Sequence, residues 1–404
     1  MRIEDATLEE RSGRYRLSAT LAWEDVGRPP ERLWFEVRPG DAAFLTDAWE
    51  PFVVAAYPLA LASGEDRVAV EGSLCPRLCD DLPSFGRVLA GAGDAQPPTL
   101  DPGAGCVAPR PSDGGSVACF LSGGVDSLAM LRANHREYPR DHPGRITAGV
   151  TLFGLNSFDF DGGRPVAERE DAFRRYLGRL EALGEGMGVR VVPVRTNVRH
   201  LYPDFATWAR VGGAAGTIAG GMVLAAGVRT LWFASHGNLP DPRPTIAHQF
   251  HVHLLSNAAL EVHLGQGGVG RFRKTAVVAD WPEGRRILRS CTGYRLPEPG
   301  KINCGSCEKC VRTMLALVAL GKLHLVDAYE RDDLGPEDLA VLEDEAPLWG
   351  PEHYAECLEP LRAAGRDDLA RAVEGVLARL RRARREGAPS GVGRLADLLP
   401  WGRG

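Results

Sequence analysis

The residues best suited to bind a ligand or take part in a reaction form a polar, glycine-rich run, Ser122-Gly123-Gly124-Val125-Asp126-Ser127. The apolar stretch 116–121 before it predicts a buried strand, and Leu128-Ala129-Met130-Leu131 after it predicts the start of a helix. A loop between a strand and a helix N-terminus points backbone N–H groups and the positive end of the helix dipole at an anion. Two glycines also let a phosphate approach the backbone closely. The run therefore predicts a phosphate-binding loop, with an ordinary glycine turn as the alternative.

The polar side chains of this run have separate expected roles. Ser122 and Ser127 offer hydroxyl donors, and Asp126 could cap the helix or help to hold Mg²⁺ beside the phosphates. No Gly-Lys-Ser/Thr follows the glycines, so the run is not a Walker loop.

Four of the nine cysteines lie close together and include two C-x-x-C steps: Cys291, Cys304, Cys307 and Cys310. Four thiolates are the ligand set of a closed tetrahedral zinc site, which makes structural zinc the leading interpretation. An iron–sulfur cluster is the rival, and a redox or persulfide role would require a free sulfur. Three further cysteines, Cys75, Cys79 and Cys106, complete no metal quartet and are expected to be free thiols.

The run SGGVDS resembles the SGGxDS signature of the PP-loop ATP pyrophosphatases, and the downstream cysteine cluster resembles that of 7-cyano-7-deazaguanine synthase and its relatives. The resemblance covers about residues 116–320. It implies cleavage of ATP between the α and β phosphates, transfer of AMP to a carboxylate or carbonyl oxygen, and displacement by a nitrogen or sulfur nucleophile. It implies zinc at the four clustered cysteines and ATP contacts at Ser122, Gly123, Gly124, Val125, Asp126 and Ser127.

Two basic residues downstream are candidates for stabilising charge at the α-phosphate. PP-loop enzymes commonly place a basic residue there, and Arg271 and Lys274 join Asp126 as the expected catalytic set. A solvated basic strand end is the alternative. The preceding run 265–270 matches G-x-G-x-x-G, but no strand before it and no helix after it are evident, so a flexible loop is expected. Nearby, His248, His251 and His253 suggest a metal or a histidine-rich substrate wall.

Strand and helix patterns alternate from Ser116 onward, which predicts an α/β fold with a parallel, doubly wound, Rossmann-like (HUP) sheet. Further strands are expected at 146–153, 189–194 and 230–234, and helices at 168–187 and 212–226. Ligands of such sheets lie beyond the carboxyl ends of the strands. That rule adds three loop segments as weaker candidates: 154–157, 195–197 and 235–238.

Three regions are expected along the chain. Residues 1–110 predict an α+β accessory domain that ends in a Gly- and Pro-rich linker at 90–115. Residues 111–325 form the expected PP-loop domain, with the zinc element at 291–310, and residues 326–404 predict a helical C-terminal extension and tail.

Composition narrows the function classes. The chain has 404 residues, 44% hydrophobic, and a formal net charge of −5, so general attraction to nucleic acid is not expected. Residues 1–5 lack an apolar signal core, and glycines and Arg229 interrupt the most apolar region, 212–234, which argues against a membrane span. An odd number of cysteines without a signal segment favours a reduced compartment, the cytoplasm.

Taken with these features, the resemblance implies a cytoplasmic, AMP-forming C–N ligase that uses ATP, Mg²⁺ and Zn²⁺. Its substrate would be a small acid or a nucleobase-like molecule, and the acceptor an amine, ammonia, or a protein or peptide. The class is compatible with a homodimer. The alternatives are ATP-dependent thiolation of a nucleobase or RNA, and a non-catalytic ATP-binding scaffold.

Overall fold

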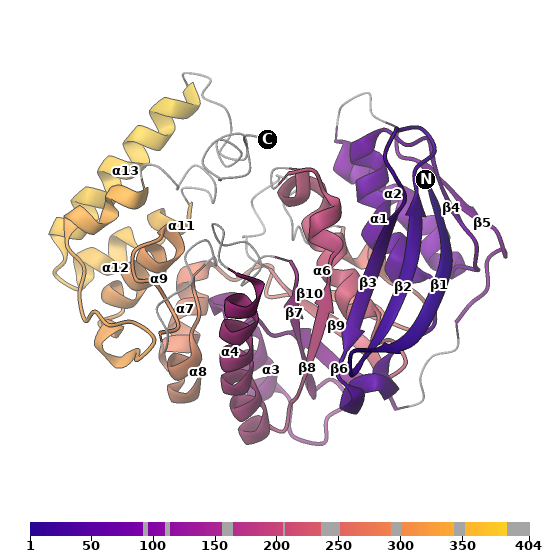
Figure 1. Ribbon diagram of the computed structural model, residues 1–404. Coiled ribbons are helices and arrows are strands. Elements are labelled where there is room, and N and C mark those ends of the chain that lie inside the picture. Colours follow the sequence, from indigo (N-terminus) through magenta and orange to yellow (C-terminus); the bar gives the residue numbers. More distant parts are fainter. Residues whose placement is uncertain are drawn as a thin grey trace.

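The computed structural model of the protein describes residues 1–91, 96–109, 114–155, 165–204, 207–235, 251–291, 301–342 and 352–385. Ten strands form one sheet in the order β10-β9-β6-β7-β8-β3-β2-β1-β4-β5, with helices on both faces (Figure 1). Six of the nine neighbouring strand pairs are parallel. The expected α/β class with a mostly parallel sheet is confirmed.

Five parallel strands make one half of the sheet: β6 (Ser116–Phe120), β7 (Ala148–Phe153), β8 (Arg190–Thr196), β9 (Val228–Ala234) and β10 (Glu261–Gly265). The chain runs outward from β6 through β7 to β8, then crosses back to β9 on the other side of β6. The strand order therefore reverses at β6. In open α/β sheets, ligands bind at the carboxyl ends of the strands beside such a reversal.

The N-terminal region extends this same sheet. It contributes β1 (Arg2–Arg11), β2 (Arg14–Ala22), β3 (Glu31–Val37), β4 (Arg67–Val70) and β5 (Thr99–Pro102). Strand β3 pairs antiparallel with β8 through Phe35 opposite Thr196, so no break in the sheet separates the two regions. The expected linker 90–115 is corrected in part, because β5 lies within it as the parallel partner of β4. Its four residues, with two prolines before them and one at its end, gave no strand pattern.

Two apolar cores lie on opposite faces of the sheet. Alternate residues of β6 divide between them, Ala118 and Phe120 in one and Val117 and Cys119 in the other, as the two-residue period of a strand requires. The first core includes side chains from α1 (Glu50–Ser63), α2 (Pro76–Ala90) and α6 (Gly213–Met222). The second includes α3 (Val125–Glu137), α4 (Val166–Met187), α7 (Arg271–Ala279), α8 (Pro282–Ile287), α9 (Glu308–Ala319), α12 (Leu358–Ala363) and α13 (Asp367–Arg385).

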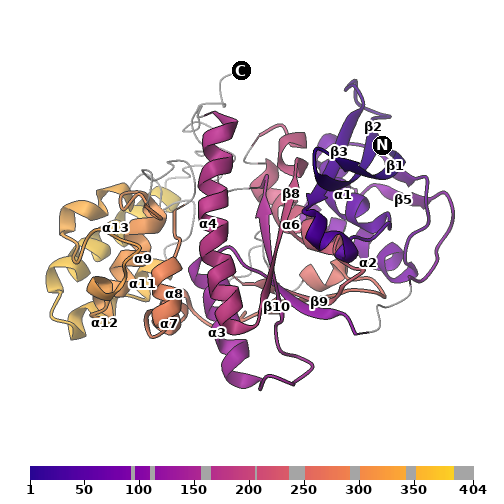
Figure 2. The ribbon, with the colours of Figure 1, turned by 60° about the horizontal axis from the view of Figure 1, so that its bottom comes forward.

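The C-terminal helices pack beside α7 and α9, away from the N-terminal strands (Figure 2). A short helix, α11 (Glu352–Ala355), precedes α12. The remaining turns are η1 (Pro39–Phe44), η2 (Val198–Leu201), η3 (Trp208–Gly212), η4 (Val252–Leu255), η5 (Leu323–Leu325) and η6 (Pro336–Ala340). Within the described ranges, each helix is too short or too polar to cross a bilayer.

The junction between β3 and β8 yields a stability prediction. The Asn197 side chain accepts a hydrogen bond from Trp34 N (2.9 Å) and donates one to Arg32 O (2.7 Å), which continues the ladder past the end of β8. Replacing Asn197 by Ala removes both bonds and should lower the free energy of unfolding by about 1–2 kcal/mol. Urea denaturation measures the change. Glu9→Ala, on the exposed part of β1, is the control and should change stability by less than about 0.5 kcal/mol.

Candidate anion-binding loop and metal centre

The glycine run lies where the sequence predicts it, between β6 and α3. Gly124 is the N-cap of α3 with extended backbone (φ −76°, ψ 164°), and Gly123 has a left-handed φ of 71°. A Cβ added to Gly123 would lie 1.6 Å from the Tyr176 hydroxyl oxygen. Both the backbone conformation and this close approach require glycine at position 123.

The two serine hydroxyls meet at the N-terminus of α3. Ser122 Oγ lies 3.2 Å from Ser127 Oγ and accepts a hydrogen bond from Gly124 N at 3.3 Å. Ser127 Oγ in turn donates to Gly124 O at 3.1 Å. These bonds hold the loop as a compact turn and place two hydroxyl groups beside the positive end of the helix dipole.

The three side chains expected to form the catalytic set lie together. Arg271 Nη1 is 2.6 Å from Asp126 Oδ2, and Lys274 Nζ is 3.5 Å from Asp126 Oδ1. Lys274 also donates to the backbone carbonyl of Ser235, at the end of β9. Its side chain is only 1% exposed, and this burial lowers its pKa while Asp126 opposes the shift. Two cations and one carboxylate therefore flank the loop, an arrangement that favours binding of an anion.

The structure corrects the interpretation of the glycine run 265–270. Strand β10 ends at Gly265 and α7 begins at Arg271, so this loop has a strand before it and a helix after it. The sequence hid both elements, because the short edge strand is half polar and the helix opens with charged residues. A Cβ on Gly265 would lie 2.3 Å from Met130 Sδ, so the glycine permits close packing on α3. Since α7 leads into α8 and not into a neighbouring parallel strand, the segment is no βαβ dinucleotide unit.

Residues 287–291 form a strap that is hydrogen-bonded to the glycine loop. Arg289 N donates to Gly123 O at 2.9 Å, and Tyr176 Oη lies 2.9 Å from Ile287 O and 3.3 Å from Ser122 O. Burial raises the pKa of Tyr176, so its hydroxyl keeps its proton and donates. The Arg289 guanidinium stacks 5.5 Å from the Tyr176 ring. Sequence reasoning placed Tyr176 only in a helix core and missed Arg289, because no local pattern marks either contact.

The strap ends at the cysteine cluster. The sulfurs of Cys291, Cys304, Cys307 and Cys310 all lie within 4.8 Å of one another, and those of Cys304 and Cys310 are 3.8 Å apart. A tetrahedral zinc ion with Zn–S bonds near 2.3 Å separates its sulfurs by about 3.8 Å. The cluster could therefore hold a metal ion such as zinc, as the spacing predicts.

Backbone geometry prepares these thiols for a metal. Cys307 is the N-cap of α9, and its N–H donates to Cys304 Sγ at 3.3 Å. Gly305 takes a φ of 72° in the turn between them. Hydrogen bonds among the four thiols, with Cys291 the main partner, lower the pKa of Cys304 and raise those of Cys307 and Cys310, so Cys304 is the thiolate that its neighbours favour.

One buried amide joins the cluster to the strap. Asn303 Oδ1 accepts from Ser290 N (2.8 Å) and Cys291 N (3.1 Å), while Asn303 Nδ2 donates to Leu288 O (2.9 Å). Ser290 Oγ also lies 3.4 Å from Cys310 Sγ. The cysteine cluster and the strap are thus one hydrogen-bonded unit that reaches the glycine loop.

The weaker candidates from the sequence, the three loop segments and the histidines, either make contacts that support the fold or lie outside the described residues. Arg195 pairs with Glu170, and Thr196 Oγ1 donates to Trp34 O at 2.8 Å, so these two strand-end residues serve the fold. Gly154, which follows β7, lies against the backbone of Thr196. Residues 156, 157 and 236–250, which include His248, lie outside the described ranges. His251 is buried edge-on against Phe85, and within the described ranges the four cysteines are the one group of three or more metal-ligand side chains in reach of each other.

The expected magnesium role of Asp126 stays a prediction. Both carboxylate oxygens of Asp126 face cations, Arg271 on one side and Lys274 on the other. Mg²⁺ usually binds through one or two carboxylates together with substrate phosphates, so these ion pairs would have to open for Asp126 to hold it. Asp126 therefore suits the role of an anchor for the two basic side chains.

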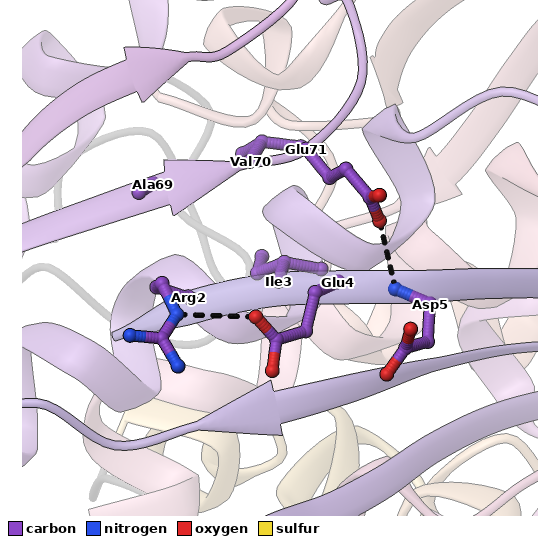
Figure 3. Close-up of a pocket in the computed structure, with 7 residues that line it drawn as sticks. All are labelled: Arg2, Ile3, Glu4, Asp5, Ala69, Val70 and Glu71. Atoms are coloured by element: carbon purple, nitrogen blue, oxygen red, sulfur yellow. Dashed lines mark hydrogen bonds and ion pairs between the residues drawn. The ribbon is translucent and has the colours of Figure 1, made fainter.

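A separate hollow of about 480 Å³ lies where β1 and β4 diverge. Its polar groups bond to each other: Arg2 Nε donates to Glu4 Oε2 (3.1 Å), and Asp5 N donates to Glu71 Oε2 (2.9 Å), as Figure 3 shows. Strand β1 lies five strand spacings from β6, about 24 Å across the sheet. This hollow is no part of the loop site.

Comparisons with known proteins do not assign the chain to a family. No protein-family model matches the chain, and neither the curated proteins nor the solved structures contain a significant match.

The strap predicts that a metal bound at the four cysteines stabilises the glycine loop. Stripping the metal with a chelator should release Cys291 and loosen residues 287–291, so amide exchange in both the strap and residues 122–126 should accelerate about tenfold, a local loss of ~1.4 kcal/mol. Hydrogen–deuterium exchange with mass spectrometry measures this, and zinc should restore protection. Strands β2 and β3 are the internal control. Faster exchange at the cysteines with an unchanged loop would contradict the coupling.

Proposed function

We propose that the chain is a PP-loop ATP pyrophosphatase, similar to the 7-cyano-7-deazaguanine synthase group, that adenylates a carboxylate or carbonyl oxygen and transfers the activated group to an amine or ammonia. The observation that carries the proposal is the convergence of Arg271 and Lys274 on Asp126 beside the SGGVDS loop. The loop also lies at β6, where the strand order reverses.

Each part of the loop has a role in such a reaction. The N–H groups at the start of α3 and the hydroxyls of Ser122 and Ser127 would hold the β and γ phosphates. The substrate oxygen attacks the α-phosphorus, the α–β bond breaks, and pyrophosphate leaves. The amine nitrogen then attacks the activated carbon, and AMP departs with the oxygen. Both steps gain mainly from positioning and charge stabilisation, so the site needs no nucleophilic side chain.

The two basic residues, Arg271 and Lys274, are suited to stabilise charge on the phosphates. Arg271 and Lys274 can exchange Asp126 oxygens for phosphate oxygens, because a phosphate offers the same charge-assisted hydrogen bonds. Lys274 is held by the fold, since α7 positions its stem and Ser235 O orients its ammonium. Such a buried, preorganised cation stabilises developing charge more effectively than a solvated one.

The thiolation alternative has less support. Cys119, on β6 next to the loop, is fully buried, and burial raises its pKa to about 12, so it is a poor sulfur carrier. The four clustered cysteines are grouped as a closed ligand set, which suits structural zinc. A buried lysine at the loop would serve ATP binding in a non-catalytic scaffold as well as in an enzyme, so turnover of ATP is the property that separates the two.

The products of ATP cleavage test the proposal. The purified protein, incubated with Mg·ATP and a panel of carboxylic acids with ammonia or amines, should release AMP and pyrophosphate. Anion-exchange chromatography of labelled nucleotide distinguishes this outcome from ADP and phosphate. Exclusive formation of ADP would rule out adenylation, and binding of ATP without turnover across the panel would favour the scaffold.

The role of Arg271 has a matched control on the same helix. Arg271→Ala should lower AMP formation about a hundredfold or more, because one charge-stabilising donor to the transition state is lost. Arg273→Ala, an exposed residue two positions along α7, should keep AMP formation within about twofold of wild type. Melting temperatures show whether both variants remain folded. Equal losses in the two variants would contradict a specific role for Arg271.

A further inference from the structure

Two cysteines outside the metal cluster lie in contact. The sulfurs of Cys79, on α2, and Cys106, just after β5, are 3.0 Å apart. They are separated by 26 residues in sequence, so the fold and not local spacing brings them together. A disulfide places its sulfurs about 2 Å apart, so a side-chain adjustment of about 1 Å would join these two.

Backbone hydrogen bonds hold the two cysteines in this register. Cys106 is fixed opposite Leu74, because Leu74 N donates to Gly105 O (3.2 Å) and Val107 N donates to Leu74 O (2.8 Å). Cys79 is held one helical turn after Cys75, whose carbonyl accepts from Cys79 N at 3.0 Å. Both backbones are therefore constrained before any bond forms between the side chains.

Accessibility singles out this pair. Cys106 is exposed and Cys79 half-buried, whereas Cys75, Cys119 and Cys357 are buried, and the other four cysteines belong to the metal cluster. The thiol of Cys75 points inward and accepts a hydrogen bond from Ala258 N at 3.3 Å. Solvent-borne reagents can therefore reach Cys106 before any other thiol outside the cluster.

We propose that Cys79 and Cys106 are a redox-active dithiol that small-molecule disulfides, such as oxidised glutathione, convert reversibly to an intramolecular disulfide. The proposal is independent of the ATP chemistry at the glycine loop. In a reduced compartment such a bond would form when the thiol–disulfide balance shifts towards oxidation.

The exchange proceeds in two balanced steps. The exposed Cys106 thiolate attacks one sulfur of oxidised glutathione, which forms a mixed disulfide and releases one glutathione thiolate. Cys79 then loses its proton to water and attacks the Cys106 sulfur, which releases the second glutathione thiolate. Two protein thiols are oxidised and one glutathione disulfide is reduced. Burial, with Cys106 alongside, raises the pKa of Cys79 to about 12, so the exposed Cys106 is the thiol that reacts first.

The link would stabilise the edge of the sheet. Strand β5 is the last strand in the order and is held by β4 on one side only. A bond from Cys106 to α2 would anchor the segment that follows this strand, so residues 99–107 should exchange amide protons more slowly in the oxidised protein.

The test uses the full-length, metal-loaded protein in glutathione buffers of increasing oxidation. Alkylation of free thiols under denaturing conditions, followed by peptide mass spectrometry, should show loss of two thiols and one linked peptide pair that joins Cys79 to Cys106. Metal content is measured in parallel, to show that the cluster cysteines stay protected. Reduced glutathione should reverse the change.

Variants separate the proposed pair from general oxidation. Cys79→Ser should accumulate one glutathione on Cys106, because the resolving thiol is gone, and Cys106→Ser should form neither the link nor the adduct. Cys357→Ser, a buried thiol in the C-terminal helices, should form the link as wild type does. Stable glutathione adducts on wild-type Cys106, a link to Cys75 instead of Cys79, or unchanged thiols across the buffers would each overturn the proposal.

Discussion

The close contact between Gly123 and the Tyr176 hydroxyl is the constraint on which the rest of the site depends. No side chain fits at position 123, and the hydroxyl that fills the space bonds to the loop and to the strap. Helix α4, which carries Tyr176, lies in the same apolar core as α3 and the cysteine-bearing helix α9. A short backbone segment thus couples three parts of the chain that are far apart in sequence.

Charge at the site obeys a second constraint. A lysine with 1% exposure loses most of its hydration, which is unfavourable unless other groups replace the lost hydrogen bonds. Asp126 and the Ser235 carbonyl do so, and Arg271 shares the carboxylate. These contacts therefore hold Lys274 and Arg271 in place beside the loop. An arriving phosphate would meet charges that need little reorganisation.

Sequence reasoning predicted the elements that have strong local patterns. Hydrophobic periodicity and ligand spacing predict the glycine loop, strands β6 to β9 and the cysteine cluster. It missed β1, β5 and β10, because a long exposed strand and two short edge strands bury too few apolar residues to show a period. It also missed Tyr176, Arg289 and Asn303, whose roles are contacts with backbone atoms distant in sequence. Such contacts depend on tertiary packing and leave no mark on the residue pattern.

The strap gives a metal at the four cysteines a possible structural role beside the glycine loop. Residues 287–291 form neither a long helix nor a strand after Ile287, so secondary structure alone cannot fix the Arg289 N–H on Gly123 O. Two anchors take its place: the Tyr176 hydroxyl at Ile287 and the Asn303 amide at Ser290 and Cys291. Asn303 is itself adjacent to Cys304, a member of the cysteine cluster. A metal bound by all four thiols would immobilise both ends of this arrangement, and thereby hold the glycine loop in the conformation that an anion requires.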